Sequence, residues 1–178
     1  TYPASALPDS ESQTGGALKH ISCTIEDGSF VLLCGTSGCG KTTMTRLFNG
    51  LIPHYHEGTY TGSVYLDGKD TRDLSLFDIS LKVGSVFQNP RSQFFNVDTT
   101  SELAFGPENH GMPEDIVRDR VKRVAAQLKL EPLLDRSIFS LSGGEKQKIA
   151  CGSAAAIDPD VYVLDEPSSN LDAYAIAD

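Results

Sequence analysis

Runs of apolar residues predict three buried β-strands in this chain. Residues 30–34, 83–87 and 161–164 are mostly apolar, and each run is followed by a glycine-rich or polar segment. An uninterrupted apolar run is typical of a strand buried on both faces of a parallel sheet. Residues 17–25 alternate apolar and polar positions, which predicts a strand with one solvated face that turns at Asp27-Gly28.

Helical periodicity is clearest in residues 114–128. Apolar residues recur there at helical spacing, as Val117, Val121, Val124 and Leu128, and the stripe is interpreted as core packing. Pro113 precedes the helix, and acidic residues in its first turn suit the helix dipole. Two more helices are expected, one from Lys41 to about Leu51 with Asn49-Gly50 as its stop, and one from the segment after Leu141 to about Ile157.

Between these elements, the pattern predicts loops and one further strand. Residues 51–62 are expected to form a surface loop, in which His54 and His56 lack the acidic or cysteine neighbours of a metal site. Residues 63–68 predict a strand that ends in a turn, and residues 90–111 are expected to be rich in loops.

Composition limits the function without assigning it. The chain has 178 residues, a net charge of −9 and a pI near 4.8, so it is expected to be one domain that does not coat nucleic acid. Its four cysteines are far apart in sequence, which favours reduced thiols in a cytosolic protein. No apolar run is long enough to span a membrane, and the polar first twenty residues are not expected to be a signal peptide. Thr1 and Asp178 suggest a chain cut at both ends.

The first motif with defined chemistry is a phosphate-binding loop between a predicted strand and a predicted helix. It reads GxxxxGK[ST], and its candidate nucleotide-binding residues are Gly35, Thr36, Ser37, Gly38, Cys39, Gly40, Lys41, Thr42 and Thr43. Glycines allow the backbone N–H groups to surround an anion, and the dipole of the following helix adds to this site. Lys41 is expected to reach the β- and γ-phosphates and Thr42 to ligate Mg²⁺. The alternative is a glycine-rich turn that matches by chance.

A second motif consists of two acids at the end of the strand at residues 161–164. With a phosphate-binding loop in the same chain, Asp165 is interpreted as the residue that holds Mg²⁺ and Glu166 as the residue that polarises an attacking water. Adjacent residues at a strand end point to opposite faces, so the two carboxylates are free to have different roles. The alternative is an acidic strand end that faces solvent.

A third motif narrows the class of nucleotide-binding protein to which these motifs point. Residues Leu141, Ser142, Gly143, Gly144 and Glu145 read LSGGE, after the phosphate-binding loop and before the strand that ends in Asp165 and Glu166. This order resembles the ATP-binding-cassette (ABC) ATPases over essentially the whole chain. The resemblance implies an α/β P-loop NTPase fold with a parallel sheet, an N-terminal antiparallel β portion and a small inserted helical subdomain. Within residues 1–178, residues 1–88 and 140–178 would form the ATP-binding core and residues 89–139 the helical subdomain.

The resemblance also assigns roles. Two such domains would pair head to tail, with ATP between one phosphate-binding loop and the partner's signature residues, so that Ser142 and the N–H groups of Gly143 and Gly144 contact the γ-phosphate. Gln88 matches the family's Q-loop, which senses Mg²⁺ and water. Tyr2 stands where the family has an aromatic residue that stacks on adenine. The family's D-loop corresponds to Ser169, Asn170, Leu171 and Asp172.

The segments 88–95, 102–109 and 49–54 are similar to the ATPases of energy-coupling-factor transporters, which import vitamins or cobalt and nickel ions. This resemblance implies a peripheral protein on the cytoplasmic face of the cell membrane. Its partners would be a second ATPase domain, a transmembrane scaffold that docks on residues 88 to about 105, and a membrane subunit that captures the substrate.

The chain departs from the family pattern in three places. Glu145 replaces the usual glutamine, Cys39 a frequent serine and Ser168 the usual threonine. The family's switch histidine would lie beyond Asp178, so this chain alone is expected to bind nucleotide weakly and to hydrolyse it poorly.

Two other functions are alternatives for a chain with these motifs. One is a soluble ABC-type ATPase that acts on ribosomes or DNA; the short segment between Gln88 and Ser142 and the acidic composition argue against it. The other is a regulatory cassette with little turnover, which the presence of Lys41, Asp165 and Glu166 argues against.

Overall fold

The structure is a computed structural model in which residues 18–56 and 60–167 are described. The candidate residues Tyr2, Ser169, Asn170, Leu171 and Asp172 lie outside these ranges. The chain divides into two compact units, Thr1–Ile79 and Ser80–Asp178, and each is described by itself.

The first unit contains short elements around the phosphate-binding loop. Its helices are α1 (Lys41–Phe48), α2 (Leu51–His54), the 3₁₀ turn η1 (Thr71–Asp73) and α3 (Leu76–Ser80). Strands β1 (Tyr65–Leu66) and β2 (Lys69–Asp70) form an antiparallel hairpin. Its two turn residues, Asp67 and Gly68, both have positive φ angles, of 50° and 76°. Positive φ at both positions gives the twist that a two-residue hairpin turn needs.

Three predictions for this unit are wrong. Residues 30–34 are not a buried strand: Phe30 is 90% and Leu32 74% exposed. Residues 18–25 are not in a strand either, although Asp27-Gly28 forms the expected turn, with a hydrogen bond from Ser29 N to Glu26 O. A strand is stabilised by hydrogen bonds to a neighbouring strand, and none of the described strands pairs with these segments. The predicted loop at residues 51–62 begins with helix α2, after the expected stop of α1 at Asn49-Gly50.

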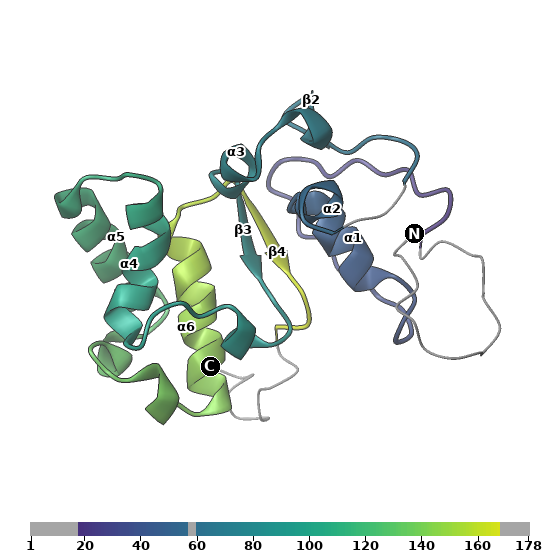
Figure 1. Ribbon diagram of the computed structural model, residues 1–178. Helices are drawn as coiled ribbons and strands as arrows, with labels where there is room; N and C mark the ends of the chain where they lie inside the picture. The colour runs from purple at the N-terminus through teal and green to yellow at the C-terminus, as the bar shows by residue number, and fades with distance from the viewer. Residues whose placement is uncertain (1–17, 57–59, 168–178) are drawn as a thin grey trace. The chain divides into compact units, whose positions relative to one another are not determined.

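The second unit contains a parallel strand pair covered by helices. Strands β3 (Val83–Val86) and β4 (Val161–Leu164) form a parallel pair, with Val83 opposite Val161. Strand β3 is buried, as its apolar run predicts, but the predicted burial of β4 is wrong at Val161, Tyr162 and Leu164, which are 37%, 51% and 44% exposed. Among the described strands, β4 pairs with β3 alone. Helix α6 (Gly143–Ala156) lies between this strand pair and the helices α4 (Thr99–Asn109) and α5 (Glu114–Gln127) (Figure 1). Three 3₁₀ turns connect these elements: η2 (Pro90–Ser92), η3 (Glu131–Leu133) and η4 (Ile138–Ser140).

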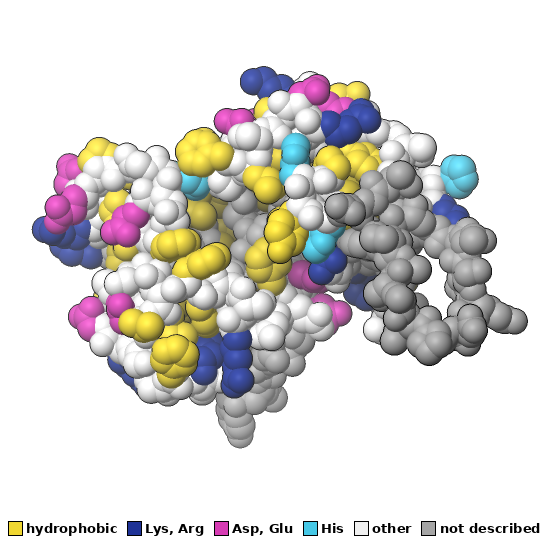
Figure 2. Space-filling view, in the orientation of Figure 1, with side chains coloured by type: hydrophobic (Ala, Val, Ile, Leu, Met, Phe, Trp, Pro, Cys, Tyr) yellow, Lys and Arg dark blue, Asp and Glu magenta, His cyan; other side chains and the backbone are white. Residues whose placement is uncertain are grey.

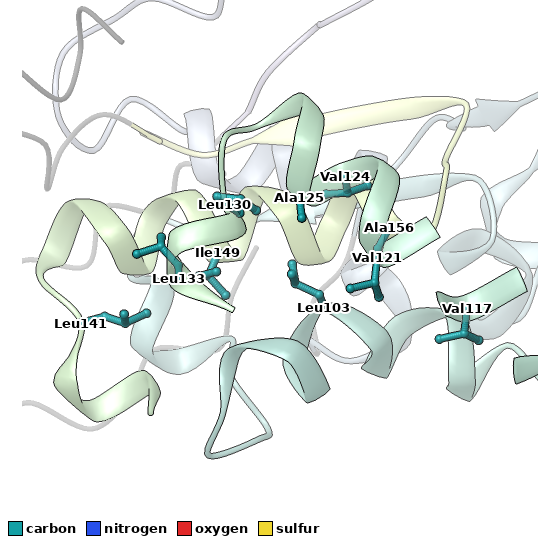
Figure 3. Packing of buried hydrophobic residues seen from close by; sticks show 10 residues of the cluster. All are labelled: Leu103, Val117, Val121, Val124, Ala125, Leu130, Leu133, Leu141, Ile149 and Ala156. Carbon is teal, nitrogen blue, oxygen red and sulfur yellow. The ribbon is translucent and has the colours of Figure 1, made fainter. Parts of the chain in front are cut away.

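The core of this unit lies where α4, α5 and α6 meet. Figure 3 shows its ten buried residues, which are Leu103, Val117, Val121, Val124, Ala125, Leu130, Leu133, Leu141, Ile149 and Ala156. The predicted stripe of α5 is therefore confirmed at its three valines. It is wrong at Leu128, which is 38% exposed because it follows the last turn of α5 as its C-cap.

The sequence pattern predicts a loop-rich segment at residues 90–111, but eleven of these residues form α4. The side chain of Asp98 caps this helix by accepting a hydrogen bond from Ser101 N at 2.8 Å. Gly106 and Pro107, which suggested a loop, lie inside α4. A β-carbon on Gly106 would be 2.6 Å from Ile157 Cγ1, so glycine permits close packing there instead of a turn.

Among the described residues, no helix is both long enough and apolar enough to cross a membrane.

Candidate functional site

The phosphate-binding loop lies at the start of α1 in the first unit. Gly38 and Gly40 have φ angles of 79° and 104°, which residues with a β-carbon rarely adopt. Gly40 is the N-cap of α1 and offers no side chain to cap it. The first N–H groups of α1 are therefore left for an anion to accept.

Lys41, the first residue of α1, bends back over the loop. Its Nζ donates to the carbonyl oxygens of Gly35 at 3.1 Å and Thr36 at 3.2 Å. The ammonium group therefore lies against the loop backbone, where it adds positive charge to the site that the N–H groups of α1 form.

In the second unit, two predicted catalytic residues contact each other. Gln88 follows β3 and Glu166 follows β4, and the parallel pairing of these strands brings both strand ends to the same edge. Gln88 Nε2 donates to Glu166 Oε2 at 2.8 Å, across 78 residues of sequence. Both side chains are exposed to solvent. An exposed carboxylate held by an amide is well placed to accept a proton from a water molecule.

The two acids after β4 differ in burial. Asp165 is only 9% exposed, and its N–H donates to Val86 O at 2.9 Å, so it extends the pairing with β3. Glu166 has a φ of 49°, outside the strand conformation. The left-handed turn at Glu166, and not strand alternation, therefore sets the direction of its side chain. Such backbone strain is frequent at functional sites.

The signature residues begin α6 with a capping box. Ser142 Oγ accepts from Glu145 N at 3.2 Å, and Glu145 Oε2 accepts from Ser142 N at 2.7 Å. The oxygen of Ser142 is thereby fixed at the positive end of α6, beside the N–H groups of Gly143 and Gly144.

Glu145 also forms an ion pair with Arg136, whose Nη1 lies 3.0 Å from its Oε1. The hydrogen bond from Ser142 N and the nearby Arg136 charge hold the pKa of Glu145 below its usual range. The carboxylate form is therefore maintained at neutral pH.

The segment after Gln88 is fixed by a buried carboxylate. Glu102, in α4, is 1% exposed, and its Oε2 accepts from Phe95 N at 3.0 Å and Asn96 N at 2.8 Å. The ring of Phe95 stacks on Phe105 at 4.8 Å between centroids but remains 75% exposed. Glu102 thus holds the backbone while Phe95 faces solvent.

The structure brings together only part of the predicted site. Gln88, Asp165, Glu166 and the signature residues belong to the second unit, and residues 35–43 to the first. The oxygen donors of Thr42, Gln88 and Asp165 are of the kind that Mg²⁺ prefers. No cluster of three or more His, Cys, Asp or Glu in the described residues could hold a metal by itself.

His54 makes a hydrogen bond between two elements of the first unit. The ring Nε2 of His54 hydrogen-bonds to Thr71 O at 2.8 Å, which ties α2 to η1. His54, at the end of α2, therefore has a structural role.

Sequence reasoning missed Arg136 and Glu102 as part of this region. Arg136 is held by Thr99, which is distant in sequence, and pairs with Glu145. Glu102 lies within residues 90–111, for which the pattern predicts loops. The signal for Glu102 was present, because an Asp98 cap followed by helix formers predicts α4.

The fold and these motifs define a P-loop NTPase of the ABC cassette type, and the sequence comparison gives the family. The family model described as ABC transporter matches residues 18–169, so the chain belongs to the ABC transporter family. A curated protein of Treponema denticola, named for ATP binding in an ABC transporter, is 54% identical over 159 residues. That match covers 89% of this chain and 32% of the relative, so the chain spans about a third of its length.

Two solved structures support the same fold. CbiO1 from Clostridium perfringens, part of the ABC transporter complex cbiONQ, is 31% identical with a TM-score of 0.68, and the match covers 80% of this chain and 56% of that one. The ATP-binding cassette MJ0796, solved as a dimer bound to ADP and Pi, is 27% identical with a TM-score of 0.75. That match covers 89% of this chain and 69% of MJ0796.

Proposed function

We propose that the protein containing this chain hydrolyses ATP with Mg²⁺ to drive transport through a membrane complex. The observation that carries this proposal is the hydrogen bond between Gln88 and Glu166 at the shared edge of β3 and β4. It joins the candidate general base to Gln88, the candidate residue for sensing Mg²⁺ and water, next to the buried Asp165.

In this mechanism, each residue acts through the group that it exposes. Lys41 and the N–H groups at the start of α1 would bind the phosphates. Thr42, Asp165 and Gln88 would hold Mg²⁺ through oxygen ligands, and the ion would supply positive charge that offsets the charge of the phosphates. Glu166 accepts the proton of the attacking water, and Gln88 orients the Glu166 carboxylate through the observed hydrogen bond.

The signature residues would act on a second cassette. Ser142 and Gly143 are exposed at the positive end of α6, where a phosphate from a second molecule can approach the N–H groups of the helix. We therefore propose head-to-tail pairing with another ABC domain, in which Ser142 contacts the γ-phosphate bound by the partner. The dimeric MJ0796 structure is consistent with such pairing.

We further propose the energy-coupling-factor type of importer, at the cytoplasmic face of the cell membrane. The similarity to cbiO1, part of a complex named cbiONQ, supports this subtype. Three apolar residues near the Q-loop segment, Phe95, Val97 and Phe139, are 75%, 65% and 79% exposed. These three residues support docking of a partner and not the subtype itself; in the proposed complex they would form the surface for a transmembrane scaffold, while a separate membrane subunit would capture a vitamin or a cobalt or nickel ion.

The test uses the full-length protein with its membrane partners in proteoliposomes. Glu166→Gln should lower ATP turnover about 10²–10⁴-fold, the usual contribution of a general base, while nucleotide binding remains. Lys41→Ala should weaken nucleotide binding itself. Glu114→Gln, on the exposed face of α5, is the control and should leave both unchanged.

A Glu166→Gln variant with wild-type turnover would contradict the assigned base. Turnover that stays uncoupled from uptake of any vitamin or metal ion would contradict the importer subtype but not the ATPase chemistry.

A further inference from the structure

The segment before the signature residues is fixed against the start of α4. Thr99 N donates to Arg136 O at 3.0 Å, and Arg136 N donates to Thr99 Oγ1 at 3.3 Å. Ile138 N donates to Val97 O at 2.9 Å, so the two segments run side by side. Thr99 is completely buried, and its hydroxyl also donates to Leu133 O at 2.6 Å. Both polar groups of the Arg136 backbone, its N–H and its carbonyl oxygen, are therefore hydrogen-bonded to Thr99.

From this fixed position, the Arg136 side chain reaches one oxygen of Glu145, and the other oxygen holds Ser142. Nη1 of Arg136 donates to Oε1 at 3.0 Å, and Ser142 N donates to Oε2 at 2.7 Å. One carboxylate thus connects the anchored Arg136 to the residue that begins α6. The pair is only partly covered, with side-chain exposures of 40% and 31%.

We propose that Arg136 is a positioning residue for the signature site, which it orients through Glu145. The proposal rests on the proposed function, in which Ser142 contacts a γ-phosphate. Glu145 places a negative charge close to where that phosphate would bind. Arg136 compensates this charge and prevents the carboxylate from rotating away from Ser142 N.

This role predicts a dependence between the two residues. A glutamine at position 145 can keep the capping box, because its amide oxygen also accepts from Ser142 N, and it has no charge to compensate. Arg136 should therefore matter in the presence of Glu145 and lose its importance in the presence of glutamine.

The experiment uses the full-length protein and two measurements. Hydrogen exchange of the Ser142 and Glu145 amides, without nucleotide, reports directly on the capping box. Arg136→Gln should accelerate their exchange about two- to fivefold, the range for a partly exposed ion pair, and Arg136→Lys should restore part of the protection. Arg118→Gln removes an exposed ion pair with Glu114 on α5 and is the matched control, with no expected change.

The second measurement is the steady-state kinetics of ATP hydrolysis. Arg136→Gln should lower kcat about two- to fivefold with an unchanged KM, since nucleotide first binds at the phosphate-binding loop and the signature contact forms afterwards. In the Glu145→Gln background, the same substitution should have no further effect. A general loss of stability would persist in that background.

Either of two results would overturn the proposal: unchanged exchange and kcat in Arg136→Gln, or an undiminished effect of Arg136→Gln in the Glu145→Gln background. If the wild-type protein does not hydrolyse ATP, the proposed function fails, and the exchange data alone decide whether Arg136 orients Ser142.

Discussion

Glu145 shows how one residue serves both the structure and the candidate site. Its carboxylate caps α6 and pairs with Arg136, and both contacts favour the charged form. The position corresponds to a glutamine in the pattern that the sequence resembles, and either side chain can accept from Ser142 N. Only the carboxylate, however, makes this capping box depend on pH.

We predict that acid weakens the fold partly through Glu145. Its pKa is lower in the folded chain than the ordinary value of 4.5, which is expected when the chain is unfolded. Its stabilising contribution is therefore complete above that value and is lost as the pH falls through the lower folded pKa. Urea unfolding of wild type and Glu145→Gln between about pH 6 and pH 3 measures the difference.

The Glu145→Gln variant should lose less stability than wild type over this range, with Glu114→Gln as the control for an exposed carboxylate. A parallel pH dependence of wild type and Glu145→Gln would contradict the prediction.

At the scale of elements, the strand pair β3–β4 depends on a close approach by α6 and the turn that follows it. A β-carbon on Gly84 would lie 2.7 Å from Pro159 Cγ and 3.2 Å from Ala154 O. Gly84 is buried in β3, so neither neighbour has free space into which to move. This contact sets the distance between α6 and the strands that carry Gln88 and Glu166.

Gly84→Ala should therefore destabilise the protein by about 1–3 kcal/mol, the usual cost of overpacking. Denaturant unfolding of the full-length protein measures this cost. Adding Pro159→Ala to Gly84→Ala removes the nearest atom and should recover part of it, whereas Pro159→Ala alone should not stabilise. An unchanged unfolding midpoint in Gly84→Ala would show that α6 shifts without cost.

Element types were predicted well where one pattern dominated. The runs at residues 83–87 and 161–164 and the periodic residues 114–128 gave β3, β4 and α5, although only β3 and α5 show the burial that such a pattern predicts. The similar run at residues 30–34 gave no strand, because a strand also needs a neighbour with which to pair. Helix α4 was missed because Gly106 and Pro107 are typical of turns. In the fold, Gly106 serves close packing against Ile157, which is distant in sequence.

At the scale of the whole molecule, the surface is acidic on balance, with a net charge of −9, yet several large apolar side chains are exposed. Figure 2 shows hydrophobic side chains at the surface among charged ones. Val97 accepts a hydrogen bond from Ile138 N through its carbonyl oxygen, and Phe139 follows Ile138 in sequence. The backbone N–H of Phe95 donates to the Glu102 carboxylate. Apolar side chains held exposed on a fixed backbone are typical of docking surfaces.

We predict that Phe95→Ala and Phe139→Ala each weaken association with the proposed membrane scaffold, by about 1–2 kcal/mol or roughly five- to thirtyfold. Titration of detergent-solubilised scaffold with the full-length protein measures the affinity. Ile116 lies in α5 and its side chain is 42% exposed, so Ile116→Ala is the control for loss of apolar surface elsewhere. An equal loss of affinity in all three variants would assign the effect to general instability.

The sequence by itself determined the class of chemistry, because the glycines, Lys41, Asp165, Glu166 and the LSGGE residues are local motifs whose spacing is written along the chain. It also determined the two strands that carry Gln88 and Glu166. Only the tertiary structure decided that these two side chains hydrogen-bond, that Arg136 holds Glu145, and that Glu102 holds the segment at Phe95. The physical reason is that each of these contacts joins residues through the fold, where burial and backbone geometry select partners that no local pattern specifies.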